Sequence, residues 1–249
     1  MKDLGTYIEL INSASTQDEA FQRFSAIMAG YGYERVAYSL ITDHPSLGLS
    51  KQHGLATSYP LHWMKYYQEK KYLKDDPVVL GVLKSRTPFF WSDLKQDPDI
   101  PEASFQILDQ GSESGVKDGL AIPLLGQPGE IVGLGLARKE SEKGKDYRFM
   151  SDAFLLSTFF HEKFRSLLKK PATIKLTPRE RDILSWAAEG KTDPDIAVIL
   201  GISFNTVRWN WKNIFQKLDA NGRLYCITKA IMMGLVSPGQ ITSVPPTNW

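Results

Sequence analysis

Apolar residues recur at helical spacing over much of the chain, and short runs rich in β-branched residues separate these stretches. The spacing predicts helices near residues 2–13, 17–30, 60–70, 77–84 and 101–111. Strands are predicted over residues 35–41, 119–124 and 131–136, and the last two flank a turn at 126–129. Helices packed on the faces of a central sheet would bury these apolar positions, so this part of the chain indicates an α+β domain.

The chain is predicted to divide after a long amphipathic stretch over residues 147–168. Pro171 cannot continue a helix, and a new helix with its own cap begins soon afterwards. We therefore expect a first domain over residues 1–168, a linker over 169–175, a second domain over 176–236 and a mobile tail over 237–249.

The second domain is predicted to contain four helices, the last of them over residues 224–236. Polar caps precede the first three helices at Thr177, Thr192 and Ser203, and Glu180 completes a capping box with the first. The second and third helices are short and are joined by a tight turn. This arrangement is typical of a helix-turn-helix.

A helix-turn-helix places its second helix in the major groove of DNA, with the first residues of that helix at the base edges. Outward positions of this helix hold Asn205, Arg208, Trp209 and Lys212, and Arg208 is the candidate for recognising a guanine. Candidate phosphate contacts are Ser203 and Thr206 at the helix start, and Lys212, Lys217 and Arg223. The alternative is a small helical bundle with a solvated basic face.

Composition excludes several classes of protein. Of 249 residues, 42% are hydrophobic and 23% charged, which is typical of a globular protein, and no apolar run approaches a membrane span. The N-terminus lacks the features of a signal peptide, so we expect a cytoplasmic protein that does not enter a membrane. A single cysteine, Cys226, and four scattered histidines argue against disulfides and metal sites. Residues 172–249 carry nine Lys or Arg against six Asp or Glu, an excess that falls in the predicted DNA-binding segment.

Aromatic residues are concentrated between positions 59 and 91. Tyr59, Trp63 and Tyr67 recur every four residues and share one face of a predicted helix. Such a stripe is more typical of a core than of a ligand site, but buried phenol and indole groups need partners that a ligand with carbonyl groups could supply. Asp76 is suited to capping the helix that begins at Pro77, and its second carboxylate oxygen would still be free to bind a ligand.

The second domain resembles the LuxR-type DNA-binding domain. The resemblance rests on residues 176–184, 186–192, 195–203, 206–207, 213–214, 217–218 and 234–235. Positions that the family holds nearly fixed fall on Glu180, Leu184 and Gly190. In one departure, Trp209-Asn210-Trp211 stands where the family usually has a Phe-His pair.

The first domain resembles the autoinducer-binding domain of LuxR-type quorum-sensing regulators, through Tyr59-Pro60, Trp63, Tyr67, Asp76-Pro77, Trp91 and Gly115. The resemblance implies an α-β-α sandwich that encloses an N-acyl homoserine lactone. It implies that Trp63 donates to the lactone carbonyl and Tyr59 to the amide carbonyl, and that Asp76 accepts from the amide N–H. Tyr67 and Trp91 would enclose the head group. The acyl chain is expected to lie along Val36, Tyr38, Leu40, Leu55, Val79 and Leu134.

Two departures concern the ligand. Val78 and Gly135 stand where the family often has residues with hydroxyl groups, and the small Gly135 is expected to leave space for a bulkier ligand group. The resemblance implies a homodimer that binds a palindromic operator, and RNA polymerase is an expected further partner of an activator. Residues 147–168 and 224–236 are candidate dimerisation elements.

Three alternatives to a lactone-responsive regulator are compatible with parts of the pattern. The first is an unpaired regulator of the same type that responds to another small molecule or acts without a ligand. The second is a phosphorylation-driven response regulator, and the sequence lacks the acidic pair, strand-end Asp and later Lys of a receiver domain. The third is an enzyme, but the sequence has no nucleophile elbow, phosphate-binding loop or metal cluster. We therefore expect neither catalysis nor a cofactor.

Overall fold

The computed structural model describes residues 3–140, 144–168 and 174–239, and the chain forms two compact units whose main division falls between residues 169 and 170. Residues 169–173 of the expected linker and 240–249 of the expected tail lie outside the described residues. Each unit is therefore described separately, as an N-terminal domain and a C-terminal domain.

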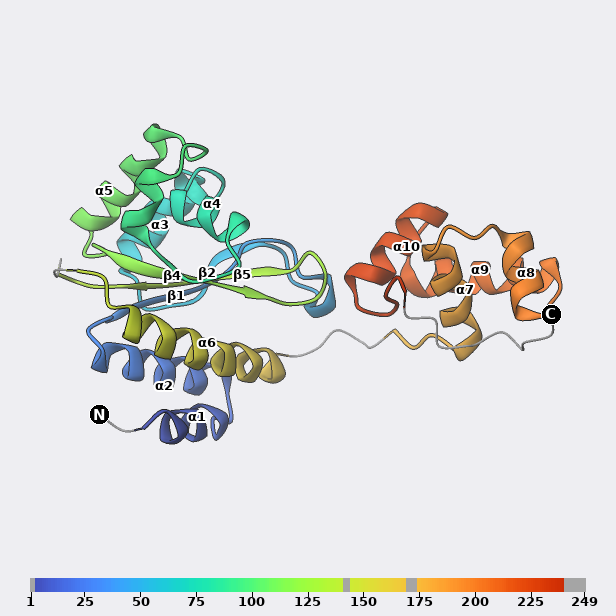
Figure 1. Cartoon of the computed structure of the whole chain (residues 1–249), viewed down its shortest axis with the longest axis horizontal. Coiled ribbons are helices and arrows are strands. Elements are labelled where there is room, and N and C mark those ends of the chain that lie inside the picture. Colours follow the sequence, from blue (N-terminus) through green and yellow to red (C-terminus); the bar gives the residue numbers. More distant parts are fainter. Residues whose placement is uncertain (1–2, 141–143, 169–173, 240–249) are drawn as a thin grey trace. The chain divides into compact units, whose positions relative to one another are not determined.

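The N-terminal domain is built on an antiparallel sheet of five strands in the order β2-β1-β5-β4-β3 (Figure 1). The strands are β1 (Arg35–Leu40), β2 (Gln52–Thr57), β3 (Phe89–Phe90), β4 (Gly119–Leu125) and β5 (Ile131–Ala137). β1 pairs with β5 and β5 with β4 in unbroken register, so these three strands form the centre of the sheet. Both faces of this centre are buried, as expected for a sheet between two helical layers.

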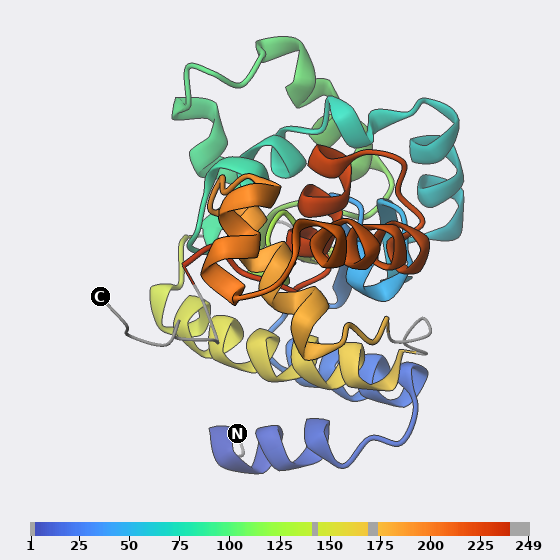
Figure 2. The same ribbon diagram turned by 90° about the vertical axis from the view of Figure 1, so that its right-hand side faces the viewer.

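Three helices cover one face of the sheet: α1 (Leu4–Asn12), α2 (Gln17–Gly30) and α6 (Tyr147–Leu167). Figures 1 and 2 show α6 lying against α2, with α1 outside them. Tyr38 of β1 faces this layer, where its ring centroid lies 4.8 Å from that of Phe164 and 5.5 Å from that of Phe160. Phe160 in turn stacks on Phe24 at 4.4 Å. An aromatic core therefore joins the sheet to α2 and α6.

The opposite face carries α3 (Leu61–Glu69), α4 (Pro77–Lys84) and α5 (Gln106–Glu113) (Figure 1). Short 3-10 turns lie at η2 (Tyr72–Lys74), η3 (Trp91–Gln96) and η4 (Glu102–Phe105), and a further one at η1 (Pro45–Leu47). The helix predicted over 101–111 begins with η4 and becomes α-helical only at α5. The two layers and the sheet between them make the N-terminal domain an α-β-α sandwich, as predicted.

The sequence pattern missed β2 and β3. β3 has only two residues, too few for a periodic signal. β2 contains Gly54 at a φ of +63°, and glycine inside a strand weakens the strand pattern. Gly54 forms part of a bulge, which the pairing of β1 with β2 records as a register shift between Tyr38 and Leu40.

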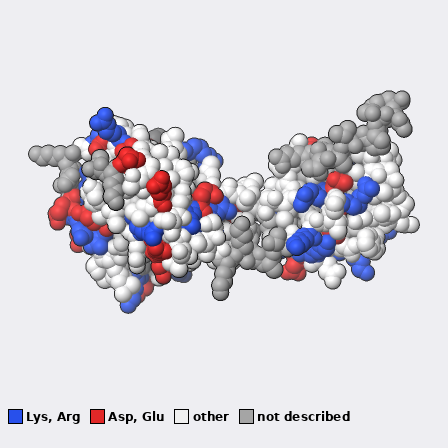
Figure 3. All heavy atoms as spheres, turned by 90° about the horizontal axis from the view of Figure 1, so that it is seen from below, with Lys and Arg blue, Asp and Glu red and all other residues white. Residues whose placement is uncertain are grey.

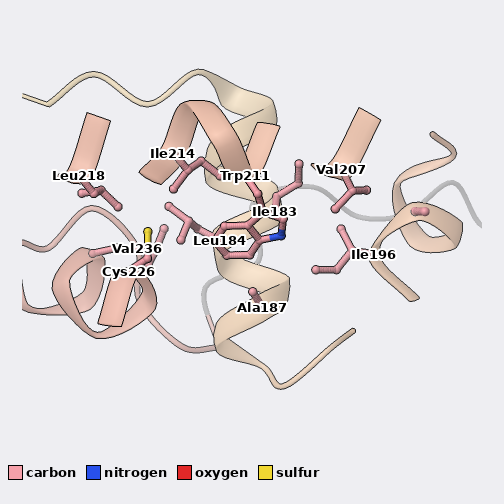
Figure 4. Packing of buried hydrophobic residues seen from close by; sticks show 12 residues of the cluster. Ile183, Leu184, Ala187, Ile196, Val207, Trp211, Ile214, Leu218, Cys226 and Val236 are labelled. Atoms are coloured by element: carbon pink, nitrogen blue, oxygen red, sulfur yellow. The ribbon is translucent and has the colours of Figure 1, made fainter. Parts of the chain in front are cut away.

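The C-terminal domain consists of α7 (Pro178–Ala188), α8 (Asp193–Leu200), α9 (Phe204–Leu218) and α10 (Arg223–Met232). The predicted caps are present: Thr177 and Glu180 form a capping box, and Ser203 accepts from the N–H of Thr206. Figure 4 shows the core where these helices meet, with Ile183 and Leu184 beside Trp211 and Ile214. The fourth helix ends at Met232, short of the predicted end at residue 236.

No helix in the described part of the chain is long and apolar enough to cross a membrane. Likewise, the described residues contain no group of three or more His, Cys, Asp or Glu side chains placed to hold a metal ion.

Candidate functional site

A cavity lies in the N-terminal domain between the sheet and the layer of α3, α4 and α5. It holds about 570 Å³ of space between protein atoms, part of it open to solvent. All seven residues predicted to bind a ligand line it: Tyr59, Trp63, Tyr67, Asp76, Val78, Trp91 and Gly135. The sequence spreads these residues over 77 positions, and the fold brings them together from the β2–α3 segment, α3, α4, η3 and β5.

Asp76 is the acidic group of the cavity and is 7% exposed. Its Oδ1 accepts from the N–H of Val78 at 2.8 Å, so Asp76 caps the start of α4, as the sequence predicted. Its Oδ2 accepts from the Tyr67 hydroxyl at 2.8 Å. Burial raises the pKa of the Asp76 carboxyl above its ordinary value, although both hydrogen bonds act in the opposite direction. Each oxygen retains a second lone pair, so the carboxylate can accept a further hydrogen bond.

Several hydrogen-bond donors line the cavity together with this single carboxylate. The indole Nε1 of Trp91 is buried and has no partner among the described residues. The Tyr59 phenol keeps its proton, because burial raises its pKa far above the ordinary value and the nearby Asp76 charge adds to this. Trp63, 4% exposed, adds a second indole to the lining. The cavity is therefore apolar, with several donors and one strong acceptor.

Gly135 does not leave the space that the sequence suggested. A Cβ atom at this position would lie 2.8 Å from the Tyr59 hydroxyl oxygen and 3.8 Å from the Trp91 ring. The phenol of Tyr59 thus fills the space beside Gly135. The expectation that Gly135 admits a bulkier ligand group is wrong for this reason.

The prediction of the residues that line the acyl channel is also partly wrong. Val79 lines the cavity, but Tyr38 lies on the opposite face of the sheet, where its hydroxyl is 2.8 Å from His161 Nδ1. Leu134 of β5 borders the cavity, but it pairs directly with Tyr38, so its side chain lies on the same opposite face. Side chains alternate along a strand, so Val36 and Leu40 share the face of Tyr38. The cavity is lined instead by Ala37, Ser39 and Ile41. Because β1 is buried on both faces, its hydrophobicity could not indicate which set faces the ligand side.

His53 is a titratable residue of the cavity lining that the sequence analysis did not single out. It lies in the β2 bulge, where Gly54 donates its N–H to Ser39 Oγ at 2.9 Å. Ser39 Oγ is also 3.0 Å from His53 Nδ1, and the imidazole stacks on the Tyr67 ring at 4.2 Å. The buried Nε2 of His53 has no partner in the described ranges. The strand and its bulge were not predicted, so no sequence signal placed this histidine in the cavity.

The predicted DNA-contacting residues lie at the start and along one face of α9. Ser203, Asn205, Thr206, Arg208, Trp209 and Lys212 are all exposed. Trp209 is 64% exposed, which is unusual for so large an apolar side chain. Its neighbours have structural roles: Asn210 donates to the Thr206 carbonyl at 2.8 Å, and Trp211 packs in the core. Of the three residues that depart from the family pattern, Trp209 alone is therefore available to DNA.

Two predicted phosphate contacts are engaged within the domain. Lys217 Nζ lies 2.6 Å from the buried Glu180 carboxylate, and Arg223 forms an ion pair with Asp193. Asp193 Oδ1 also accepts from Trp211 Nε1 at 3.0 Å, which ties α8 to α9. Lys217 and Arg223 therefore have structural roles within the domain, and their contact with phosphates stays a prediction. On the face shown in Figure 3, blue Lys and Arg groups stand out on the C-terminal domain, whereas both signs are mixed over the N-terminal domain.

Comparisons with known proteins agree with both halves of this structure. A family model described as autoinducer binding domain matches residues 16–164, and one described as bacterial regulatory proteins, luxR family, matches residues 175–230. The chain is 33% identical over 219 residues to the quorum sensing-dependent transcriptional regulator RpaR of Rhodopseudomonas palustris, a match that covers 86% of this chain and 87% of RpaR.

Solved structures show the same fold. The crystal structure of Escherichia coli SdiA aligns with a TM-score of 0.77 at 23% identity, covering 94% of this chain and 98% of SdiA. CepR2 of Burkholderia cenocepacia, described as an N-acylhomoserine lactone dependent factor, aligns at 0.54 with 21% identity over 66% of this chain and 95% of its own. The members of this family are transcriptional regulators rather than enzymes, and they combine an autoinducer-binding domain with a DNA-binding helix-turn-helix. The chain belongs to the LuxR family of quorum-sensing transcriptional regulators.

Proposed function

We propose that the N-terminal cavity binds an N-acyl homoserine lactone and that binding controls attachment of the C-terminal domain to DNA. The observation that carries this proposal is the imbalance of polar groups, in which one carboxylate, that of Asp76, shares an otherwise apolar cavity with several hydrogen-bond donors. A complementary ligand has several acceptors, one donor and an apolar tail. An acyl homoserine lactone has two carbonyl groups, one amide N–H and an acyl chain.

The polar groups suggest how the ligand is held. The amide N–H would donate to Asp76, whose carboxylate is oriented by Tyr67 and by the start of α4. The phenol of Tyr59 would donate to the amide carbonyl, and Trp63 to the lactone carbonyl. Trp91 would enclose the head group and offers a further indole N–H. Hydrogen bonds to an ionised acceptor contribute more than neutral ones, so Asp76 is expected to dominate recognition of the amide.

Ligand binding to the folded state alone stabilises that state, and we propose that it also favours a homodimer. Two copies of α9 would then contact a palindromic operator with half-sites about one helical turn apart. Within each half-site Arg208 would recognise a guanine, and Asn205, Trp209 and Lys212 would make neighbouring contacts. RNA polymerase would be a further partner if the protein is an activator.

Thermal unfolding of the full chain tests the ligand. The panel contains acyl homoserine lactones of increasing chain length, and each ring-opened acyl homoserine serves as a matched control. Each ring-opened compound carries a carboxylate of its own, which would add a second negative charge to a cavity that already holds Asp76. The cavity lining offers no cationic partner for it, so we expect a raised midpoint with the closed lactones only. Octanoyl glycerol, which is bound in a structure of SdiA, represents other acyl ligands. A shift with this glyceride but with none of the lactones would overturn the proposal and favour a regulator of another small molecule.

A further inference from the structure

His53 has a buried nitrogen that the proposed lactone contacts leave without a partner. The indole and phenol donors suffice for the carbonyl groups of the head and the amide, and Asp76 accepts the amide proton. His53 Nε2 is not needed for any of these contacts. It is nevertheless buried, has no partner in the described residues, and belongs to a side chain that lines the same cavity. A buried polar atom without a partner is costly, so its retention in a binding cavity points to a ligand.

The neighbours of His53 determine which nitrogen carries the proton. Ser39 Oγ accepts from the N–H of Gly54 at 2.9 Å, and its own hydrogen needs an acceptor because Ser39 is 3% exposed. Among the described residues that acceptor is His53 Nδ1, at 3.0 Å. Nδ1 therefore lacks a proton, and the neutral ring carries it on Nε2. Burial lowers the pKa of the imidazole to about 4, so the ring is neutral at physiological pH. His53 Nε2 is thus a neutral donor.

His53 lies close to the residues that would hold the ligand amide. Its ring stacks on Tyr67 at 4.2 Å, and the Tyr67 hydroxyl donates to Asp76. Its ring centroid is also 6.3 Å from that of Tyr59, the proposed partner of the amide carbonyl. One aromatic ring therefore separates His53 from the groups that would hold the amide. An acceptor within its reach would lie near the amide end of the acyl group and not at the far end.

We propose that His53 determines ligand specificity by donating from Nε2 to an oxygen at position 3 of the acyl group, so that the cavity prefers 3-oxo and 3-hydroxy acyl homoserine lactones over unsubstituted ones. This inference rests on the proposed function. The Ser39–Gly54 contact fixes the donor, because it directs Nδ1 to the sheet and leaves Nε2 for the ligand.

Titration calorimetry on the full chain tests the inference with two matched ligand pairs: hexanoyl and 3-oxohexanoyl homoserine lactone, and octanoyl and 3-oxooctanoyl homoserine lactone. One neutral hydrogen bond corresponds to about a 3- to 10-fold preference for the 3-oxo member of each pair. In His53→Phe the ring can still stack on Tyr67 but has no donor, so the preference should fall to about 1-fold while the unsubstituted lactone still binds. His53→Gln loses the imidazole but places an amide N–H near the former Nε2, and should retain a preference.

Both variants lack the imidazole nitrogen that contacts Ser39, so both lose the same structural contact. A difference in their preference for the 3-oxo ligand therefore comes from the presence or absence of an N–H donor. Equal affinity of the unaltered protein for both members of each pair would overturn the inference and leave the proposed function standing. An unchanged preference in His53→Phe, or equal loss of all ligands in both variants, would also overturn it. Absence of binding by every lactone to the unaltered protein would overturn the proposed function itself, and this inference with it.

Discussion

Replacing Asp76 by Asn separates the two roles of this residue. The Asn side-chain oxygen can accept from the Val78 N–H in place of Oδ1, and Asn caps helices as well as Asp. The Asn amide can then donate to the Tyr67 hydroxyl, so the second contact is kept with its direction reversed. The variant also avoids the burial penalty that raises the pKa of the Asp76 carboxyl. We expect the unliganded protein to change in stability by less than about 1 kcal/mol.

The ligand amide, in contrast, would meet a donor where it requires an acceptor. A hydrogen bond to a charged group contributes about 1.5–3 kcal/mol, which corresponds to about 10- to 150-fold in the dissociation constant. Calorimetry with the preferred lactone measures this loss, and chemical denaturation without ligand measures stability. Asp75→Asn is the matched control, because Asp75 is exposed and contacts Lys74 at 3.8 Å outside the cavity. Equal losses of affinity and of unliganded stability in Asp76→Asn would refute the reasoning and leave capping as the whole role of Asp76.

Four further outcomes are expected. Arg208→Ala should abolish specific binding in a gel-shift assay while the lactone still binds, whereas Arg181→Ala, the same change on an exposed part of α7, should leave operator affinity intact. Gly135→Ala should weaken lactone binding about 3- to 10-fold, because the new methyl group displaces the Tyr59 hydroxyl, and the effect should vanish in a Tyr59→Phe background. Burial lowers the pKa of His161 to about 3, so its contribution to stability is complete above about pH 6.5 and declines as pH falls toward 3; His161→Gln should reduce the acid-side slope of unfolding free energy by up to about 1.4 kcal/mol per pH unit, and an unchanged slope would contradict this. A fragment that lacks residues 1–171 should give the circular dichroism spectrum of a folded helical domain, and an unfolded fragment would show that the expected boundary is misplaced.

The sequence predicted those parts of the molecule that are specified locally. The capping boxes at Thr177 and Thr192 mark helix starts with side chains three residues away, so the C-terminal helices could be placed from sequence. The seven cavity residues came from a family resemblance, since periodicity alone cannot distinguish a core stripe at Tyr59, Trp63 and Tyr67 from a ligand site.

Features that depend on contacts distant in sequence were not predicted. The space at Gly135 is filled by Tyr59, 76 residues earlier in the chain, and no local pattern records that encounter. His53 enters the cavity because a bulge in β2 pairs with Ser39 across the sheet. The acyl channel was assigned to the wrong face of β1 because both faces of that strand are buried. Each error concerns which partner a residue meets, which is determined by the tertiary fold.

The unpartnered groups of the cavity also connect ligand binding to folding. His53 Nε2 and Trp91 Nε1 are buried donors without partners in the described residues, and each such group costs the unliganded protein about 1–3 kcal/mol unless water satisfies it. A ligand that accepts from them removes this penalty in the folded state only. At a concentration one hundred times its dissociation constant, any such ligand stabilises the fold by about 2.7 kcal/mol. For a domain of this size that corresponds to about 5–10 °C in the unfolding midpoint, which is large enough for the fraction of folded regulator to depend on the ligand.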